Sequence, residues 1–114
     1  MKLVSIQVGR PQTIQFQGKS ILTGIQKNRI DGPIQVGRLN IEGDGQADLK
    51  VHGGPDKAVY AYSADAYDAW RQMRPHDAFA GGSMGENLTI ETLPETKIYV
   101  GDVFELGGTV LEAC

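Results

Sequence analysis

The chain has 114 residues and a mass of 12.3 kDa, a length typical of a single domain over residues 1–114. Hydrophobic residues make up 40% of the chain and charged residues 22%, which excludes a disordered tail and a membrane protein. The net charge of −3 disfavours a nucleic-acid-binding protein, and a single cysteine excludes an intrachain disulfide scaffold.

The N-terminal residues show no secretion signal. Residues 1–8 alternate between apolar and polar side chains, whereas a signal peptide needs a continuous apolar stretch. No apolar run approaches the ~20 residues that span a bilayer. The sequence therefore predicts a cytoplasmic protein that contacts neither a membrane nor nucleic acid.

Alternation of apolar and polar residues predicts that much of the chain is β-strand, because successive side chains of a strand point to opposite faces. The predicted strands cover residues 2–8, 13–17, 21–23, 34–36, 38–42, 57–62, 87–91, 97–100, 103–106 and 109–112. Glycine-containing turns predict a hairpin at the second and third of these strands. They also predict a three-stranded meander at the last three.

Only residues 64–74 carry a helical pattern. Ser63 is placed to cap the helix, Asp65 suits its first turn, and Pro75 ends it. We expect Tyr67 and Trp70 to pack this helix against the strands. Many short strands, one clear helix and 15 glycines predict a mainly β fold, a small β-barrel or sandwich with one or two short helices.

Residues 43–58 are the segment richest in reactive side chains. They hold Asp44, Asp48 and His52 among glycines that include Gly53 and Gly54. Consecutive glycines allow backbone N–H groups to converge on an anion, and polar loops often carry function. The alternative is a surface loop whose aspartates bond the local backbone. Asp48 and His52 without a third ligand are too few for a metal site, so no metal ligand is predicted.

Two further segments contain candidate binding groups. Residues 23–29 carry a hydroxyl and two cations, including Lys27, that could hold a phosphate; the alternative is a charged edge that discourages strand pairing. Residues 82–89 form a glycine-rich entry to a strand, where Asn87 could bond a polar ring or close the loop locally. No Ser-His-Asp triad or phosphate-loop motif is present, so no catalytic residue is predicted.

The order of these motifs resembles the MOSC domain family, named after the C-terminal domain of molybdenum cofactor sulfurase. The similarity is to small stand-alone bacterial members and extends over nearly the whole chain. It is carried by Thr23-Gly24-Ile25-x-Lys27, Gly43-Asp44-Gly45-Gln46-Ala47-Asp48, His52-Gly53-Gly54-Pro55-Asp56-Lys57 and Gly85-Glu86-Asn87-Leu88-Thr89.

The resemblance implies a MOSC-like, mostly β barrel that binds the molybdenum cofactor, a pterin dithiolene with a phosphate. Related stand-alone members reduce N-hydroxylated compounds with electrons from a flavin reductase, which would be this chain's partner. We expect the loops at residues 43–56 and 82–87 to form one polar pocket, with Lys27 near its wall. The implied cofactor-binding residues are Lys27, Asp44, Asp48, His52, Gly53, Gly54 and Asn87.

The chain departs from the family pattern near its C-terminus. Members place a molybdenum-binding cysteine in a Pro-Arg-x-Pro-Cys stretch after the strand that corresponds to residues 109–112, and this sequence lacks that stretch. Cys114 stands too early to be that ligand. The resemblance therefore implies a MOSC domain shortened at its C-terminus. The alternative function is a non-catalytic binding or assembly module derived from such a domain.

The last predicted strand leads us to expect a homodimer. Without the later family strands, residues 109–113 have an unpaired edge, and such edges invite pairing with another chain. Leu106, Val110 and Leu111 would also lose apolar cover. A twofold dimer is the commonest way to cover such a patch. The alternative is that residues 1–8 close the edge within one chain.

Overall fold

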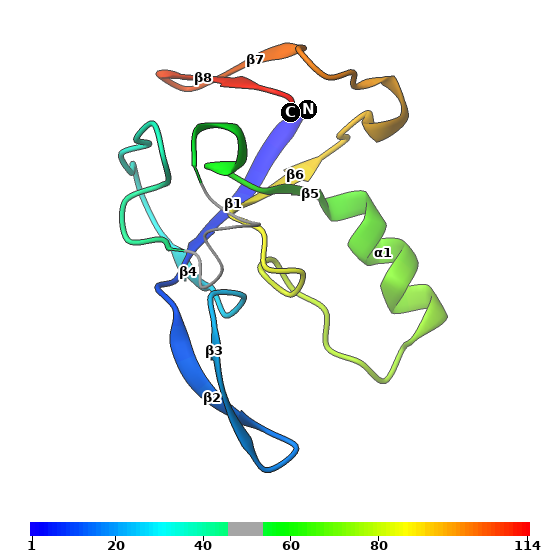
Figure 1. Cartoon of the computed structure of the whole chain (residues 1–114). Helices are drawn as coiled ribbons and strands as arrows, with labels where there is room; N and C mark the ends of the chain where they lie inside the picture. The colour runs from blue at the N-terminus through cyan, green and yellow to red at the C-terminus, as the bar shows by residue number, and fades with distance from the viewer. Residues whose placement is uncertain (46–53) are drawn as a thin grey trace.

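The computed structural model describes residues 1–45 and 54–114, and its centre is a four-stranded sheet. The strand order is β4 (Asn28–Ile30), β1 (Lys2–Val8), β6 (Leu88–Glu91) and β5 (Ala61–Ser63). Strand β1 pairs antiparallel with β4 and β6, whereas β5 and β6 are parallel (Figure 1). The N-terminal strand therefore lies in the middle of the sheet.

Two hairpins complete the strands. Strands β2 (Gln12–Phe16) and β3 (Lys19–Thr23) pair across a turn at Gln17 and Gly18, whose φ angles are 51° and 77°. Positive φ at both turn residues is typical of two-residue hairpin turns.

Strands β7 (Val103–Leu106) and β8 (Thr109–Glu112) form the second hairpin. The two hairpins lie at opposite ends of the molecule in Figure 1.

The prediction of a mainly β fold is confirmed, but the strands do not close into a barrel. Residues 1–45 and 54–114 form one four-stranded sheet and two separate two-stranded sheets. Among the described residues, each hairpin pairs only with itself, and β4 and β5 remain the edges of the central sheet. The alternative expectation was that residues 1–8 close the edge of the last strand, β8. This expectation is wrong, because β1 pairs with β4 and β6.

Several predicted strands are wrong because local turns produce the same alternation. Residues 34–42 contain only an isolated bridge between Val36 and Ile41. Residues 55–57 form a short 3-10 turn, η1 (Pro55–Lys57), so the strand expected from residue 57 begins only at β5. Residues 95–97 form a second such turn, η2 (Glu95–Lys97), in place of the start of the predicted strand.

The predicted helix is confirmed as α1 (Ala64–Met73), which lies beside the central sheet in Figure 1. The Ser63 hydroxyl accepts a hydrogen bond from the Ala66 N–H at 3.2 Å, as expected for an N-cap. Tyr67 is only 1% exposed. Trp70 stacks on Phe79, with ring centroids 6.1 Å apart, and its indole N–H donates to the Tyr62 hydroxyl. Aromatic contacts therefore hold the helix in place.

The apolar core is small and partly open. Its fully buried members are Ile41, Leu88 and Ile90. Half-buried apolar side chains pack around them, namely Leu3, Ile6, Val8, Ile34, Val36, Val59, Leu93, Leu106 and Leu111. Within residues 1–45 and 54–114, no helix is long and apolar enough to cross a bilayer.

Replacement of the helix cap tests its contribution to the fold. Ser63→Ala removes the acceptor of the Ala66 N–H, so the free energy of unfolding should fall by about 1 kcal/mol in urea titrations. Ser20→Ala is the matched control, because the Ser20 hydroxyl accepts only an exposed side-chain bond from Gln15. The control should change stability by less than about 0.5 kcal/mol, and equal effects would contradict the capping role.

Candidate functional site

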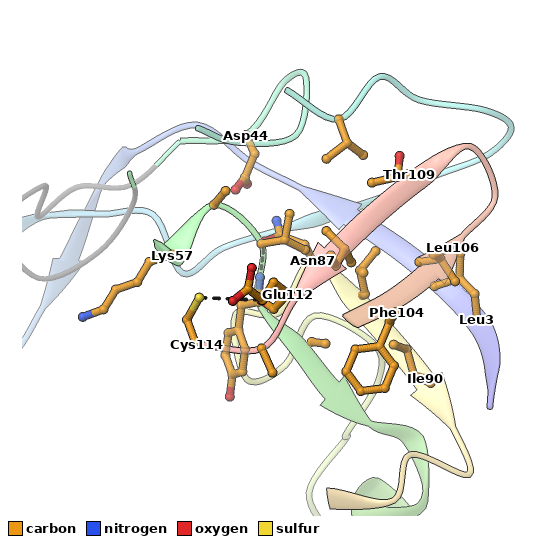
Figure 2. A pocket seen from close by; sticks show the side chains of 18 of the residues that line it. Leu3, Asp44, Lys57, Asn87, Ile90, Phe104, Leu106, Thr109, Glu112 and Cys114 are labelled. Atoms are coloured by element: carbon orange, nitrogen blue, oxygen red, sulfur yellow. Dashed lines mark hydrogen bonds between the residues drawn. The ribbon is translucent and has the colours of Figure 1, made fainter. Parts of the chain in front are cut away.

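A wide cleft of about 1570 Å³ opens between the central sheet and the β7–β8 hairpin. Figure 2 shows that its two sides differ in character. Apolar side chains, among them Leu3, Phe104 and Leu106, gather on one side. Asp44 and Lys57 lie toward the other side. The cleft therefore combines an apolar wall with a polar end.

The polar end contains a buried ion pair between Lys27 and Asp44. The Lys27 ammonium lies 2.6 Å from Asp44 Oδ1, and the two side chains are 5% and 0% exposed. The Gly9 N–H also donates to Asp44 Oδ1 at 3.0 Å, and the Gly9 and Gly45 carbonyls lie 3.5 Å from the ammonium. Removal of one partner from such a pair would leave an uncompensated buried charge. The pair therefore holds both side chains together at this end of the cleft.

Gly9 brings the two members of this pair together. A Cβ atom at Gly9 would stand 2.2 Å from the Gln26 carbonyl oxygen, so only glycine permits the backbones to approach this closely. Lys27 follows Gln26 directly, and its ammonium thereby reaches the carboxylate that the Gly9 N–H also binds. A single close backbone contact therefore sets the position of the ion pair.

Asn87 lines the same cleft, but its side chain is engaged with backbone groups. Its Oδ1 accepts from the Tyr60 N–H at 3.0 Å, and its Nδ2 donates to the Gln7 carbonyl at 3.2 Å. These bonds join strand β1 to the segment that leads into β5. Asn87 therefore holds two walls of the cleft together.

The structure brings three of the predicted cofactor-binding residues to one cleft. Lys27, Asp44 and Asn87 all line it. Gly54 precedes the η1 turn, whose residues line the cleft as well, and it adopts a positive φ of 80° that favours glycine. The remaining predicted residues, Asp48, His52 and Gly53, lie outside the described part of the chain. A cofactor-binding role for all seven stays a prediction.

A second buried polar centre, which was not predicted from the sequence, is the carboxylate of Glu86, which is 0% exposed. The Tyr67 hydroxyl lies 2.7 and 2.8 Å from its two oxygens, and the Thr89 hydroxyl donates at 2.9 Å. The backbone N–H groups of Gly82 and Met84 donate at 2.7 and 3.2 Å. No basic side chain in the described part of the chain pairs with Glu86. Hydrogen-bond donors alone therefore compensate the buried carboxylate.

A cluster of neutral polar side chains extends this centre into the sheet. Gln7 Nε2 donates to the Ser5 hydroxyl, and the Thr89 hydroxyl lies 3.3 Å from Gln7 Oε1. The backbone of Gly81 closes over the cluster, since a Cβ there would stand 2.5 Å from Gln7 Nε2. A sequence signal did exist, because Ser5 and Gln7 are polar residues that share one face of the strand predicted at residues 2–8.

The environment of Glu86 also affects the tyrosine beside it. Burial raises the pKa of the Tyr67 hydroxyl well above its ordinary value of 10, and its hydrogen bond to Glu86 raises that pKa further. Burial likewise raises the pKa of Tyr60, with a contribution from the neighbouring Tyr62. Both shifts favour the neutral hydroxyl over the phenolate.

At the cleft, the described residues offer hydrogen bonds and the buried Lys27–Asp44 ion pair, but they form no metal centre. In residues 1–45 and 54–114, no group of three or more His, Cys, Asp or Glu side chains is placed to hold a metal ion. Cys114 lines the cleft, and its thiol lies 3.6 Å from the Glu112 carbonyl oxygen. This part of the chain is therefore equipped to bind and orient a group.

Comparison with known sequences relates the chain to one family. A sequence model of the MOSC domain matches residues 48–114. The uncharacterized protein YflK of Bacillus subtilis is 44% identical over 112 residues, which are 96% of this chain and 49% of YflK. YiiM of Escherichia coli is 36% identical over 111 residues, 96% of this chain and 48% of YiiM. A Gibberella moniliformis protein named "Reductase" is 32% identical and matches over 96% of this chain but only 19% of its own length.

Solved structures give the same relationship. YiiM from Geobacillus stearothermophilus superposes with a TM-score of 0.71 at 30% identity, covering 97% of this chain and 48% of that one. YiiM from Escherichia coli superposes with a TM-score of 0.64 at 27% identity, covering 98% of this chain and 44% of that one. The chain thus spans about half the length of YflK and YiiM.

Replacement of the buried carboxylate tests its structural role. Glu86→Gln places an amide N–H₂ group against N–H and O–H donors, so the free energy of unfolding should fall by about 2–3 kcal/mol in urea titrations. Glu91→Gln is the matched control at the end of the strand that follows, β6, because Glu91 is exposed. A loss in Glu86→Gln no larger than in the control would show that the four donors do not depend on the carboxylate.

The raised pKa of Tyr67 predicts a loss of stability at alkaline pH. Below pH 10 the hydroxyl is protonated in both states. Above pH 10 the unfolded chain loses this proton while the folded chain keeps it, so ionisation favours unfolding until the folded-state pKa is reached. In this range Tyr67 should contribute a slope of up to about 1.4 kcal/mol per pH unit.

The measurement is the free energy of unfolding in urea as a function of pH. Tyr67→Phe should show a flatter alkaline profile than the natural chain, although it should be less stable at neutral pH. Tyr99→Phe serves as the control, because Tyr99 is 71% exposed and should leave the profile unchanged. Parallel profiles for the natural chain and Tyr67→Phe would contradict the assignment.

Proposed function

Because the chain belongs to the MOSC domain family, we propose that it forms part of a binding site for the molybdenum cofactor. The observation that supports this proposal is the position of Lys27, Asp44 and Asn87. These residues come from separate segments of the chain, yet they line one cleft beside the η1 turn. The described residues of the family motifs therefore face a common space.

The described residues fit the binding part of such a site. The apolar wall of the cleft offers surface for a flat pterin ring, and a phosphate at the polar end would share the Lys27 ammonium with Asp44, because the lysine side chain is only 5% exposed. Asp44 fixes this ammonium in place at 2.6 Å and balances its charge, so the pair orients an anion more than it attracts one. The chemistry that the bound cofactor would supply is electron transfer at its metal.

We further propose that the reaction is the reduction of an N-hydroxylated compound. The N–O bond would break, an electron pair and protons would be taken up, and water would leave. The electrons would come from a flavin reductase partner. The protein named "Reductase" supports this proposal in two ways. Its name fits a reduction. The segment similar to this chain is only 19% of its length, so it is joined to much further polypeptide, in which an electron-supplying part would have room.

A second candidate function is a binding or assembly module without catalysis. It is favoured by the engagement of the polar groups at the cleft, since Asp44 balances the charge of Lys27 and two backbone groups occupy the Asn87 amide. Such a module would keep the fold of the family but would not retain molybdenum. The two functions differ in the metal content of the purified protein.

Molybdenum content tests the proposed function. The chain should be purified from cells that make the cofactor, and molybdenum and pterin should be quantified per chain. The double variant Lys27→Met/Asp44→Asn removes both charges yet keeps an acceptor for the Gly9 N–H. Because a hydrogen bond to a charged group contributes about 1.5–3 kcal/mol, bound molybdenum should fall about tenfold or more.

Lys19→Met is the control for this experiment, because Lys19 is exposed on the β2–β3 hairpin. It should retain the molybdenum and pterin of the natural chain. Absence of both from the natural chain would reject the cofactor proposal and favour the non-catalytic module. Equal retention in the double variant would show that Lys27 does not hold the cofactor.

A further inference from the structure

The apolar wall of the cleft is too exposed to be a finished core. The inward-facing residues of the β7–β8 hairpin, Phe104, Leu106 and Leu111, are only half-buried. Leu106 and Leu111 pack against the small core that contains Ile90, and Phe104 lies beside Ile90 in Figure 2, yet the cleft leaves all three partly uncovered. Contiguous apolar surface of this kind normally marks a surface that another group covers.

The size of the cleft indicates what covers it. Pockets for small molecules and cofactors usually measure about 300–1000 Å³, and this cleft is about 1570 Å³. A cofactor bound at the polar end would therefore leave much of the apolar wall in water. A polypeptide segment can fill the remaining space, because it supplies apolar side chains over a longer surface.

We propose that the apolar wall is an interaction surface for polypeptide equivalent to the part of YflK and YiiM that lies outside the match. Nearly all of this chain superposes on YiiM from Geobacillus stearothermophilus, yet slightly more than half of that protein remains unmatched. The matched fold alone leaves Phe104, Leu106 and Leu111 half-exposed. The unmatched polypeptide comes from the same family and is long enough to cover these three side chains.

Backbone groups give this segment a means of attachment. In the described part of the chain, β8 pairs only with β7, so its second edge offers N–H and C=O groups for strand addition. The side chains of Thr109 and Leu111 on β8 point toward the partly covered side. An added strand would therefore gain backbone hydrogen bonds and apolar contacts together.

A second copy of this chain is the other occupant to consider, and the shape of the surface disfavours it. A twofold interface places the same surface on both sides, so that surface must be complementary to itself. A cleft is concave, and two concave surfaces placed face to face enclose a larger space that remains unfilled. The homodimer expected from the sequence would thus cover the wall less well than a separate convex segment.

The test uses the full 114-residue chain co-expressed with the part of YflK outside the match, which carries the affinity tag. The two should co-purify in equimolar amounts. The melting temperature of the chain should also rise by about 5 °C or more, because binding to the folded state alone stabilises it. Neither readout depends on molybdenum, so this proposal and the proposed function can fail separately.

Adjacent residues on β7 provide matched variants. Phe104→Glu places a charge on the apolar wall and should abolish co-purification, whereas Val103→Glu should not, because Val103 is 61% exposed and does not line the cleft. Leu111→Ala removes apolar contact without adding charge and should weaken the complex about tenfold or more. Circular dichroism of each variant alone establishes that it is folded.

Three results would overturn the proposal. The first is failure of the chain and the YflK segment to co-purify, together with unchanged melting of a fusion that joins the segment to Cys114. The second is equal loss of binding in Phe104→Glu and Val103→Glu. The third is a concentration-dependent dimer of the chain alone that Phe104→Glu dissociates, since a second copy would then occupy the wall.

Discussion

The arrangement of the structure depends most on the hydrogen bonds to the buried carboxylate of Glu86. It accepts hydrogen bonds from helix α1 through Tyr67, from strand β6 through Thr89, and from the backbone of the preceding loop through Gly82 and Met84. A carboxylate removed from water is costly unless donors surround it, so displacement of any one of these elements would leave the carboxylate with fewer donors. Asn87, the next residue, is thereby held at the wall of the cleft.

The two ends of the cleft differ in how many polar contacts hold them. Asp44 and Lys27 anchor the polar end through a buried ion pair, and Asn87 ties strand β1 to the segment before β5. The apolar side has no comparable anchor, since Phe104 and Leu111 remain half-buried. The cleft therefore has a polar end held by its own contacts and an apolar wall that is half-exposed.

The sequence predicted the hairpins and the helix, because these elements depend on residues that are close together in the chain. The strands of the β7–β8 hairpin were predicted at their observed bounds, and Ser63 fixed the start of α1. The sequence could not reveal the parallel pairing of β5 with β6, which depends on contacts distant in the chain. The strand expected at residues 97–100 fails because the Asp102 carboxylate captures the Tyr99 N–H. The motifs identified Lys27 and Asp44 as candidate binding residues. Their ion pair could not be predicted, because it depends on the close approach of the Gly9 and Gln26 backbones.

Amide hydrogen exchange at Gly82 and Met84 tests the central role of Glu86 most directly. If the carboxylate holds this loop, both N–H groups should exchange only through global unfolding, as slowly as the amides of strand β6. Their protection should disappear in Glu86→Gln, while that of β1 amides paired with β4 persists. Exchange of Gly82 and Met84 in the natural chain at the rate of an exposed loop would contradict this account.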